Sequence, residues 1–132
     1  MLRVGIDIAS VALVRAALEG HGDRYLRRVF TETELRQCCR PSPEPGRLAA
    51  LVAAKEATFK VLRVDDRPVA WTDVEVRGAF SSRPRLSLSG GAANLARDAG
   101  IDGLALSLTG SKGPSAAAVV IAHEHSADRV ER

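Results

Sequence analysis

The C-terminal third of the chain constrains the fold most, because it carries two strand-like runs joined by a turn-forming segment. The runs are "LALSLTG" and "SAAAVVIAHE", and the segment that joins them, "GSKGPS", is rich in glycine and proline. This combination predicts an antiparallel hairpin with a wide loop. A hairpin with an apolar face must be covered by other elements, which favours an α+β architecture.

The N-terminus predicts a strand followed by a helix. In "LRVGIDIA", Val4, Ile6 and Ile8 alternate as in a strand, whereas "SVALVRAALEG" spaces its apolar residues as in a helix and reaches a glycine stop at Gly20. Asp7 is therefore expected near the junction of the two elements.

The middle of the chain predicts helices first and strands later. Residues 23–40 predict one or two short helices capped by Thr31 or Thr33, and the proline-rich residues 41–46 predict a break before a long helix over 47–62. "RPVAWTDVEVRG" and "RPRLSLSG" alternate like strands, and "GAANLARDAG" predicts a short helix that ends at Gly100. We expect a single domain over 1–132, with a small antiparallel sheet packed against a long helix.

Composition narrows the functional class. The chain is 45% hydrophobic and 27% charged, which is typical of a folded globular protein, and its net charge of +3 suits an anionic partner. An aromatic content of 4% is too low for a base-stacking surface, so nucleic acid is not expected as a partner. No apolar run approaches the roughly 20 residues that cross a bilayer, and the stretch "MLRVGIDIAS" lacks the long apolar segment and the small-residue cleavage site of a signal peptide. We expect a cytoplasmic protein without membrane contact.

The cysteines and two of the histidines indicate no site of their own. Cys38 and Cys39 are neighbours, which suits neither a disulfide framework nor a zinc site, and we interpret them as free thiols near a helix end. His123 and His125 are two apart on a predicted strand and share a face. Two ligands without a third make a poor metal site, so we interpret them as surface histidines.

The lysines are few and clustered. Only three of the 19 lysine and arginine residues are lysines: Lys55 and Lys60 on the long helix and Lys112 in the hairpin loop. Glu56 and Lys60 are four apart and share a helix face. Together with Asp7, Glu56 could hold a hard divalent cation that binds substrate phosphates. Two simpler interpretations remain open: Asp7 as a helix N-cap, and Glu56 with Lys60 as a surface ion pair.

The order of six segments resembles the holo-acyl-carrier-protein synthase family, the small-subunit class of 4′-phosphopantetheinyl transferases. The segments are "GID", "RVFTETEL", "AAKEATFK", "WTDVEV", "RPRLSLSG" and "LSLTGSKGPSAAAVVIA". The resemblance implies the transferase fold and the transfer of phosphopantetheine from coenzyme A to a serine of an apo acyl carrier protein. It also implies Mg²⁺ as cofactor and a role in fatty acid or polyketide biosynthesis.

The resemblance assigns roles to individual residues. It implies Asp7 and Glu56 as metal ligands, Glu56 and Lys60 as catalytic residues, with Glu56 accepting the serine proton. It implies coenzyme A contacts for a further four residues: Lys55, Thr109, Ser111 and Lys112.

Homologues of this family are typically homotrimers whose site lies between subunits, and their first helical region meets the acidic carrier protein. The docking candidates here are Arg15, Arg24, Arg27 and Arg28, with an ordinary solvated helix face as the alternative.

Three departures from the family pattern lie on the coenzyme A side. Gly110 stands where the family has a histidine, Leu51 where it has an arginine, and residues 63–65 where it has Gly-Thr-Gly. Two hypotheses follow. The chain is an active but divergent transferase, or it is a homologue that kept the fold, binds a carrier protein and is inactive or acts on a carrier-bound intermediate of secondary metabolism.

Overall fold

The computed structural model describes residues 1–110 and 112–125. The elements in chain order are β1 (Leu2–Ser10), α1 (Val11–His21), α2 (Asp23–Val29), α3 (Glu32–Cys38), α4 (Pro45–Leu62), a short 3-10 helix η1 (Trp71–Asp73), β2 (Val74–Arg77), β3 (Arg85–Leu88), α5 (Gly90–Asp98), β4 (Ile101–Thr109) and β5 (Ser115–Glu124). This arrangement confirms the expected α+β fold.

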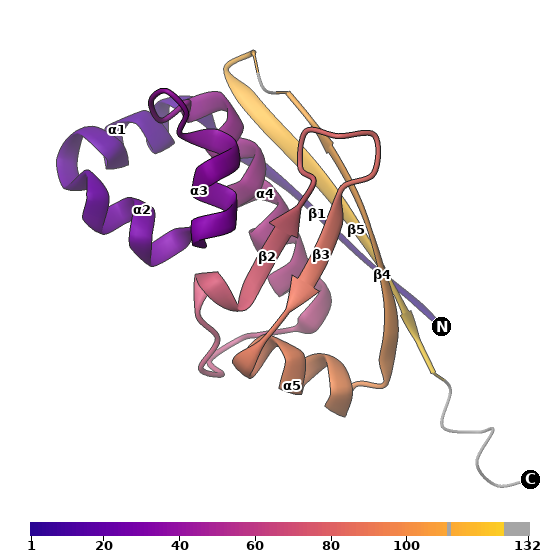
Figure 1. Cartoon of the computed structure of the whole chain (residues 1–132). Helices are drawn as coiled ribbons and strands as arrows, with labels where there is room; N and C mark the ends of the chain where they lie inside the picture. The colour runs from indigo at the N-terminus through magenta and orange to yellow at the C-terminus, as the bar shows by residue number, and fades with distance from the viewer. Residues whose placement is uncertain (111, 126–132) are drawn as a thin grey trace, which may run out of the picture.

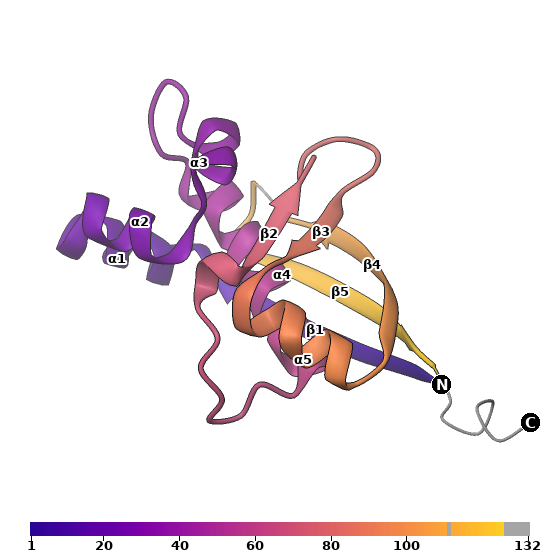
Figure 2. The ribbon, with the colours of Figure 1, turned by 60° about the horizontal axis from the view of Figure 1, so that its bottom comes forward.

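The principal sheet has three antiparallel strands in the order β1-β5-β4. β5 is central, and its register sets Asp7 of β1 opposite Ala118. The inward residues of β5 are small and buried, among them Ala116, Ala118 and Ala122, so α4 can lie close against this face. Figures 1 and 2 show α4 crossing the sheet, with α1, α2 and α3 grouped to the left of α4.

Helix α4 is covered on most of its circumference because the sheet, α1 and β2 all pack against it. It starts at Pro45, two residues earlier than the sequence predicted, because proline is tolerated in the first turn of a helix. It ends at Leu62, and the next residue, Arg63, adopts the left-handed conformation of a C-cap. The fully buried side chains along it include Leu48 and Leu51.

The remaining elements follow the sequence pattern with three refinements. The expected stop of the first helix at Gly20 is wrong, because α1 continues to His21 and Gly22 is its C-cap. Of the two proposed caps, Thr31 is the one that forms a capping box with Glu34 at the start of α3. The strand expected over "RPVAWTDVEVRG" is shorter than its pattern, because Trp71–Asp73 forms η1 and only Val74–Arg77 pairs with β3. Among the described residues, no helix has the length and apolar character needed to cross a membrane.

Candidate functional site

A lysine and two carboxyl groups meet where α4 crosses β1. The approach is close because position 5 is glycine: a Cβ there would lie 2.2 Å from the carbonyl oxygen of Ala57. Lys60 Nζ lies 3.0 Å from Asp7 Oδ1 and donates a hydrogen bond to the carbonyl oxygen of Ile6 at 2.9 Å. The Lys60 side chain is 58% exposed and that of Asp7 only 14%, so the ammonium reaches from solvent onto a largely covered carboxylate.

The two carboxyl groups of this site have opposite pKa shifts. Burial, a hydrogen bond with Asp7 and the negative charge of Asp7 raise the pKa of Glu56 to about 7. Burial also opposes ionisation of Asp7, but hydrogen bonds with Glu56 and Lys60 and the Lys60 charge lower its pKa below the ordinary value. Asp7 therefore holds the negative charge more firmly, and the pair resembles two carboxyl groups that share one proton.

The donor set fits a hard divalent cation. Asp7 Oδ2 is buried and accepts no hydrogen bond from a group within the described residues when both carboxyl groups are ionised. A buried carboxylate oxygen without a partner is costly, and either a proton on Glu56 or a cation would satisfy it. The alternative role of Asp7 as a helix cap is wrong, because Ser10 caps α1 by accepting a hydrogen bond from Leu13 N at 3.2 Å.

Lys55 does not belong to this site, so the sequence-based prediction that it contacts coenzyme A does not fit the structure. Its side chain is fully buried and its Nζ lies 2.8 Å from Glu34 Oε1. The ammonium also donates to the carbonyl oxygens of Trp71 and Val74. Successive residues on a helix point about 100° apart, so Lys55 faces α3 and β2 while Glu56 faces β1.

The hairpin loop borders a second hollow. A pocket of about 300 Å³ is lined by Thr109 and Gly110 from the hairpin, by Ala50 of α4, and by Phe80 and Ser81. Thr109 and Lys112 are both exposed, whereas Ser111 lies outside the described residues. The sequence analysis missed Arg47, whose guanidinium lies 4.8 Å from the centre of the Phe80 ring and brings positive charge to this pocket.

Two of the three departures have a structural reason. Gly110 has φ +97°, and a Cβ there would lie 2.5 Å from the carbonyl oxygen of Ser115, so this backbone excludes a histidine. Leu51 is fully buried in the core. A leucine suits this position, because its side chain contacts the core and not solvent. That the replacement weakens coenzyme A binding stays a prediction.

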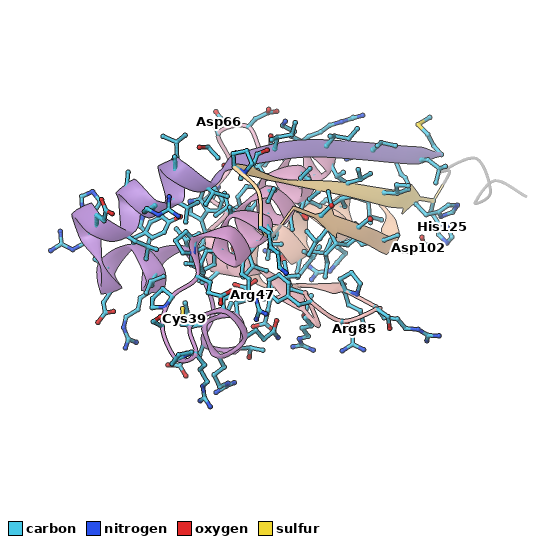
Figure 3. The ribbon with its side chains drawn as sticks, turned by 90° about the horizontal axis from the view of Figure 1, so that it is seen from above. Cys39, Arg47, Asp66, Arg85, Asp102 and His125 are labelled. Carbon is cyan, nitrogen blue, oxygen red and sulfur yellow. The ribbon has the colours of Figure 1, made fainter. Side chains whose placement is uncertain are left out.

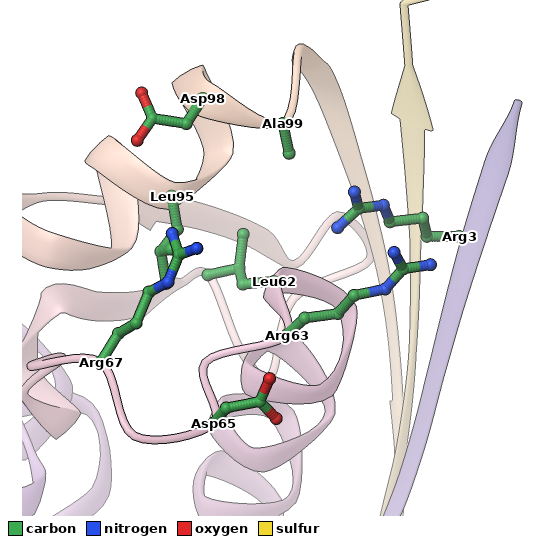
Figure 4. Close-up of a pocket in the computed structure, with 8 residues that line it drawn as sticks. All are labelled: Arg3, Leu62, Arg63, Asp65, Arg67, Leu95, Asp98 and Ala99. Carbon is green, nitrogen blue, oxygen red and sulfur yellow. The ribbon is translucent and has the colours of Figure 1, made fainter.

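The third departure keeps a glycine-like backbone. Arg63 has φ +54° and Asp65 φ +48°, which are left-handed values that glycine adopts most readily. The side chains of Arg63 and Asp65 line a pocket of about 320 Å³. Arg3, Arg67 and Asp98 line it as well. Figure 4 shows three arginine side chains around this hollow. The loop therefore departs from the family in its side chains, while its backbone retains positive φ at both outer positions.

The four predicted docking arginines are exposed, but they do not form one patch. Arg24 and Arg28 are one turn apart on α2 and line a hollow with Tyr25, whereas Arg27 lines a different hollow beside α3. Arg15 lies on α1. Tyr25 is the second residue that the sequence analysis missed: burial, and then the negative charge of Glu56, raise its pKa. Tyr25 therefore lines the hollow of Arg24 and Arg28 and also experiences the charge of Glu56.

The comparisons with known proteins agree on one family. Residues 3–110 match the 4′-phosphopantetheinyl transferase superfamily. The holo-[acyl-carrier-protein] synthase of Rhodopirellula baltica is 38% identical over 92% of this chain and 97% of its own length. That of Desulforudis audaxviator is 41% identical over 92% of each chain.

Solved structures show the same fold. The structure of the Chronobacterium ammoniagenes synthase in complex with coenzyme A is similar to this chain, with a TM-score of 0.77. The two are 27% identical, and the match covers 96% of this chain and 99% of the other. The Helicobacter pylori synthase in complex with coenzyme A has a TM-score of 0.77 at 24% identity, over 92% of this chain and all of the other, and supports the fold alone.

Proposed function

Because the chain belongs to the holo-acyl-carrier-protein synthase family of the 4′-phosphopantetheinyl transferase superfamily, we propose that it transfers the phosphopantetheine group of coenzyme A to a serine of an apo acyl carrier protein. The observation that carries this proposal is the meeting of Asp7, Glu56 and Lys60 at the crossing of α4 and β1. Residues 1–132 act as one catalytic domain, and the cytoplasmic location expected from the sequence stays a prediction.

The site residues divide the chemistry between them. The ammonium of Lys60 is a compact positive charge that lies beside Asp7 and remains largely exposed to solvent. It can therefore attract the negative diphosphate of coenzyme A to this site. Glu56, half-buried beside Asp7, accepts the proton of the attacking serine. Asp7 and Glu56 would hold Mg²⁺, which when bound supplies positive charge to the diphosphate of coenzyme A. Positioning and electrostatics account for most catalysis of phosphoryl-type transfers.

Coenzyme A is proposed to extend from this site toward the hairpin loop. The pocket beside Thr109 and Gly110 is open, and Lys112 and Arg47 bring positive charge to its surroundings. Backbone amides of the loop can add donors for a phosphate. The acyl carrier protein is proposed to meet the arginines of α2, Arg24 and Arg28, whose hollow is also lined by Tyr25, a residue that experiences the charge of Glu56.

A homotrimer is proposed on the basis of the uncovered face of the principal sheet. The outward residues of β1, Leu2, Val4, Ile6 and Ile8, are apolar and 57% to 67% exposed. Ile121 of β5, opposite Val4, extends this apolar surface. A contiguous apolar sheet face of this kind marks a protein contact. Sedimentation equilibrium is expected to give a trimer that Ile6→Glu dissociates. Leu13→Glu, at a side chain of α1 that is 72% exposed, is expected to leave the trimer intact.

The proposed reaction is tested by intact-mass spectrometry of several apo carrier proteins incubated with coenzyme A, Mg²⁺ and the protein. We expect a mass gain of one phosphopantetheine group, slowed at least about 10²-fold by Lys60→Met or Glu56→Gln. Glu19→Gln on the exposed surface of α1 is the matched control and is expected to keep full activity.

Absence of transfer to every carrier, combined with measurable carrier binding, would contradict the transferase. It would favour the alternative, a homologue that binds a carrier protein or acts on a carrier-bound intermediate.

A further inference from the structure

Three potential metal ligands converge at the far end of the principal sheet. His123 Nδ1 lies 3.1 Å from Asp102 Oδ1, and His125 Nδ1 lies 3.2 Å from Asp102 Oδ2. One ligand atom from each of the three side chains lies within 4.8 Å of the other two. Figure 3 shows Asp102 and His125 beside each other at this end of the sheet. The sequence analysis had only the two histidines, because Asp102 reaches them from the neighbouring strand.

A β-bulge brings Asp102 to the face that carries the histidines. β4 pairs Gly103 with His123 but Ile101 with Glu124, so Asp102 is the extra residue between two regular pairs. Glu124 faces inward, where it pairs with Arg3 at 2.9 Å, whereas His123 faces outward. The bulge redirects the side chain of the extra residue, and here the carboxylate reaches the outward face.

The backbone on both sides of the cluster is held in place. His125 N donates a hydrogen bond to the carbonyl oxygen of Gly100 at 2.8 Å, and Glu124 N donates to that of Met1 at 2.8 Å. Gly100 has φ +71°, which lets the chain turn directly from α5 into β4. The three side chains are therefore presented by anchored backbone at the end of paired strands.

We infer that Asp102, His123 and His125 form a binding site for a borderline divalent transition-metal ion, with Zn²⁺ as the expected occupant. Two imidazole nitrogens and one carboxylate oxygen are donors that zinc accepts in a tetrahedral site, and a water molecule can complete the set. Mg²⁺ prefers oxygen ligands in octahedral geometry and is a poor match. In the single chain the side chains are 46% to 68% exposed, so an ion can reach them from solvent.

This site is distinct from the carboxylate site on the other face. Asp7 is paired with Ala118, and His123 lies five residues further along β5, a separation of about 17 Å for an extended strand. An ion bound here would join the bulged end of β4 to the end of β5. Its role is therefore to stabilise the sheet end, independently of the proposed transfer reaction.

The test is isothermal titration of tag-free protein with Zn²⁺ in the presence of excess Mg²⁺. We expect one equivalent per chain, with an affinity that His123→Ala, His125→Ala and Asp102→Asn each weaken by at least about tenfold. His21→Ala, at the exposed end of α1, is the matched control and leaves the affinity unchanged. Circular dichroism verifies that each variant is folded, and Co²⁺ is expected to give visible absorption bands of a histidine-ligated ion that His123→Ala abolishes.

Two results would overturn the inference. One is the absence of stoichiometric Zn²⁺ binding. The other is a Zn²⁺ affinity that Asp7→Asn weakens and that the three ligand variants leave unchanged, because the ion would then be bound by the carboxylate pair.

Discussion

Lys55 Nζ lies 2.8 Å from Glu34 Oε1 in an ion pair whose two side chains are fully buried. Glu34 is satisfied on both oxygens, since it also accepts hydrogen bonds from Thr31 N at 2.9 Å and Val76 N at 2.7 Å. Burial lowers the pKa of Lys55, and the charge of Glu34 opposes that effect. This network joins α3, α4 and β2. Lys55, although it is next to Glu56 in sequence, therefore stabilises the core and is not part of the proposed site.

Replacing one partner of this pair is expected to destabilise the fold strongly. Lys55→Met leaves the Glu34 carboxylate buried without its counter-ion and is expected to lower the free energy of unfolding by about 3 to 5 kcal/mol in urea denaturation. Glu34→Gln/Lys55→Met removes both charges and keeps an acceptor for the capping box, so it is expected to recover much of that loss. A double variant as unstable as Lys55→Met would show that lost packing, rather than the unpaired charge, dominates.

A side chain at position 5 is expected to disrupt the proposed catalytic site by separating the two elements that form it. Gly5→Ala forces a Cβ against the Ala57 carbonyl and must separate β1 from α4, which moves Asp7 away from Lys60. We expect a loss of stability of about 3 kcal/mol and a lower transfer rate. Gly103→Ala, in β4 of the same sheet, meets nothing within 4 Å and is the control. Equal stability of the two variants would refute this account.

Restoring the family histidine at position 110 is expected to harm the protein. The positive φ of Gly110 and the nearby Ser115 carbonyl leave no room for a Cβ, so Gly110→His is expected to cost about 1 to 3 kcal/mol and to lower transfer activity. Gly113→Ala in the same loop has its nearest neighbour at 3.9 Å and should be tolerated. Higher activity in Gly110→His would mean that the loop adopts a different conformation during turnover.

Returning glycine to the C-cap of α4 is expected to stabilise the chain. Arg63 holds a left-handed conformation that costs a non-glycine residue about 1 kcal/mol or more, so Arg63→Gly should raise the thermal midpoint. Arg63→Ala removes the same guanidinium but keeps the strained backbone, and it should not gain stability. If both variants are stabilised alike, the gain comes from removing the charge.

The two adjacent cysteines are expected to differ in reactivity. Burial raises the pKa of Cys38 to about 12, and nearby Cys39 and Glu34 act in the same direction. Cys39 is only partly covered, so iodoacetamide at pH 8 should alkylate Cys39 first and Cys38 only on unfolding. Alkylation sites are read by peptide mass mapping, with Cys39→Ser as the control that isolates Cys38. Comparable rates at both thiols would disprove this order.

The raised pKa of Cys38 is expected to make the free energy of unfolding depend on pH in the alkaline range. Between pH 9 and about 12 the unfolded chain releases the Cys38 proton while the folded chain keeps it, so the free energy of unfolding falls as pH rises. The slope attributable to Cys38 is about 1 kcal/mol per pH unit. Cys38→Ala should show a shallower alkaline slope than the parent in parallel denaturation series, and identical slopes would contradict the assignment.

Local sequence patterns predicted the secondary-structure elements and the three side chains that meet at the main site. Alternation and helical spacing located β1, α1, α4, α5 and the β4–β5 hairpin, and the types and positions of Asp7, Glu56 and Lys60 were sufficient to predict that they act together. These features can be predicted from the sequence because strands repeat every two residues and helices every 3.6, and because the chemistry of a side chain follows from its residue type.

Which side chains of an element face which neighbour follows from packing and is not readable in the sequence pattern. Lys55 and Leu51 look accessible in an alanine-rich helix, but α3 and β2 cover their side of α4 and bury both. Asp102 joins His123 and His125 because one extra residue in β4 changes the facing of a single side chain, which no strand pattern reveals. Burial and register arise from contacts between distant segments, so they are settled by packing rather than by local sequence.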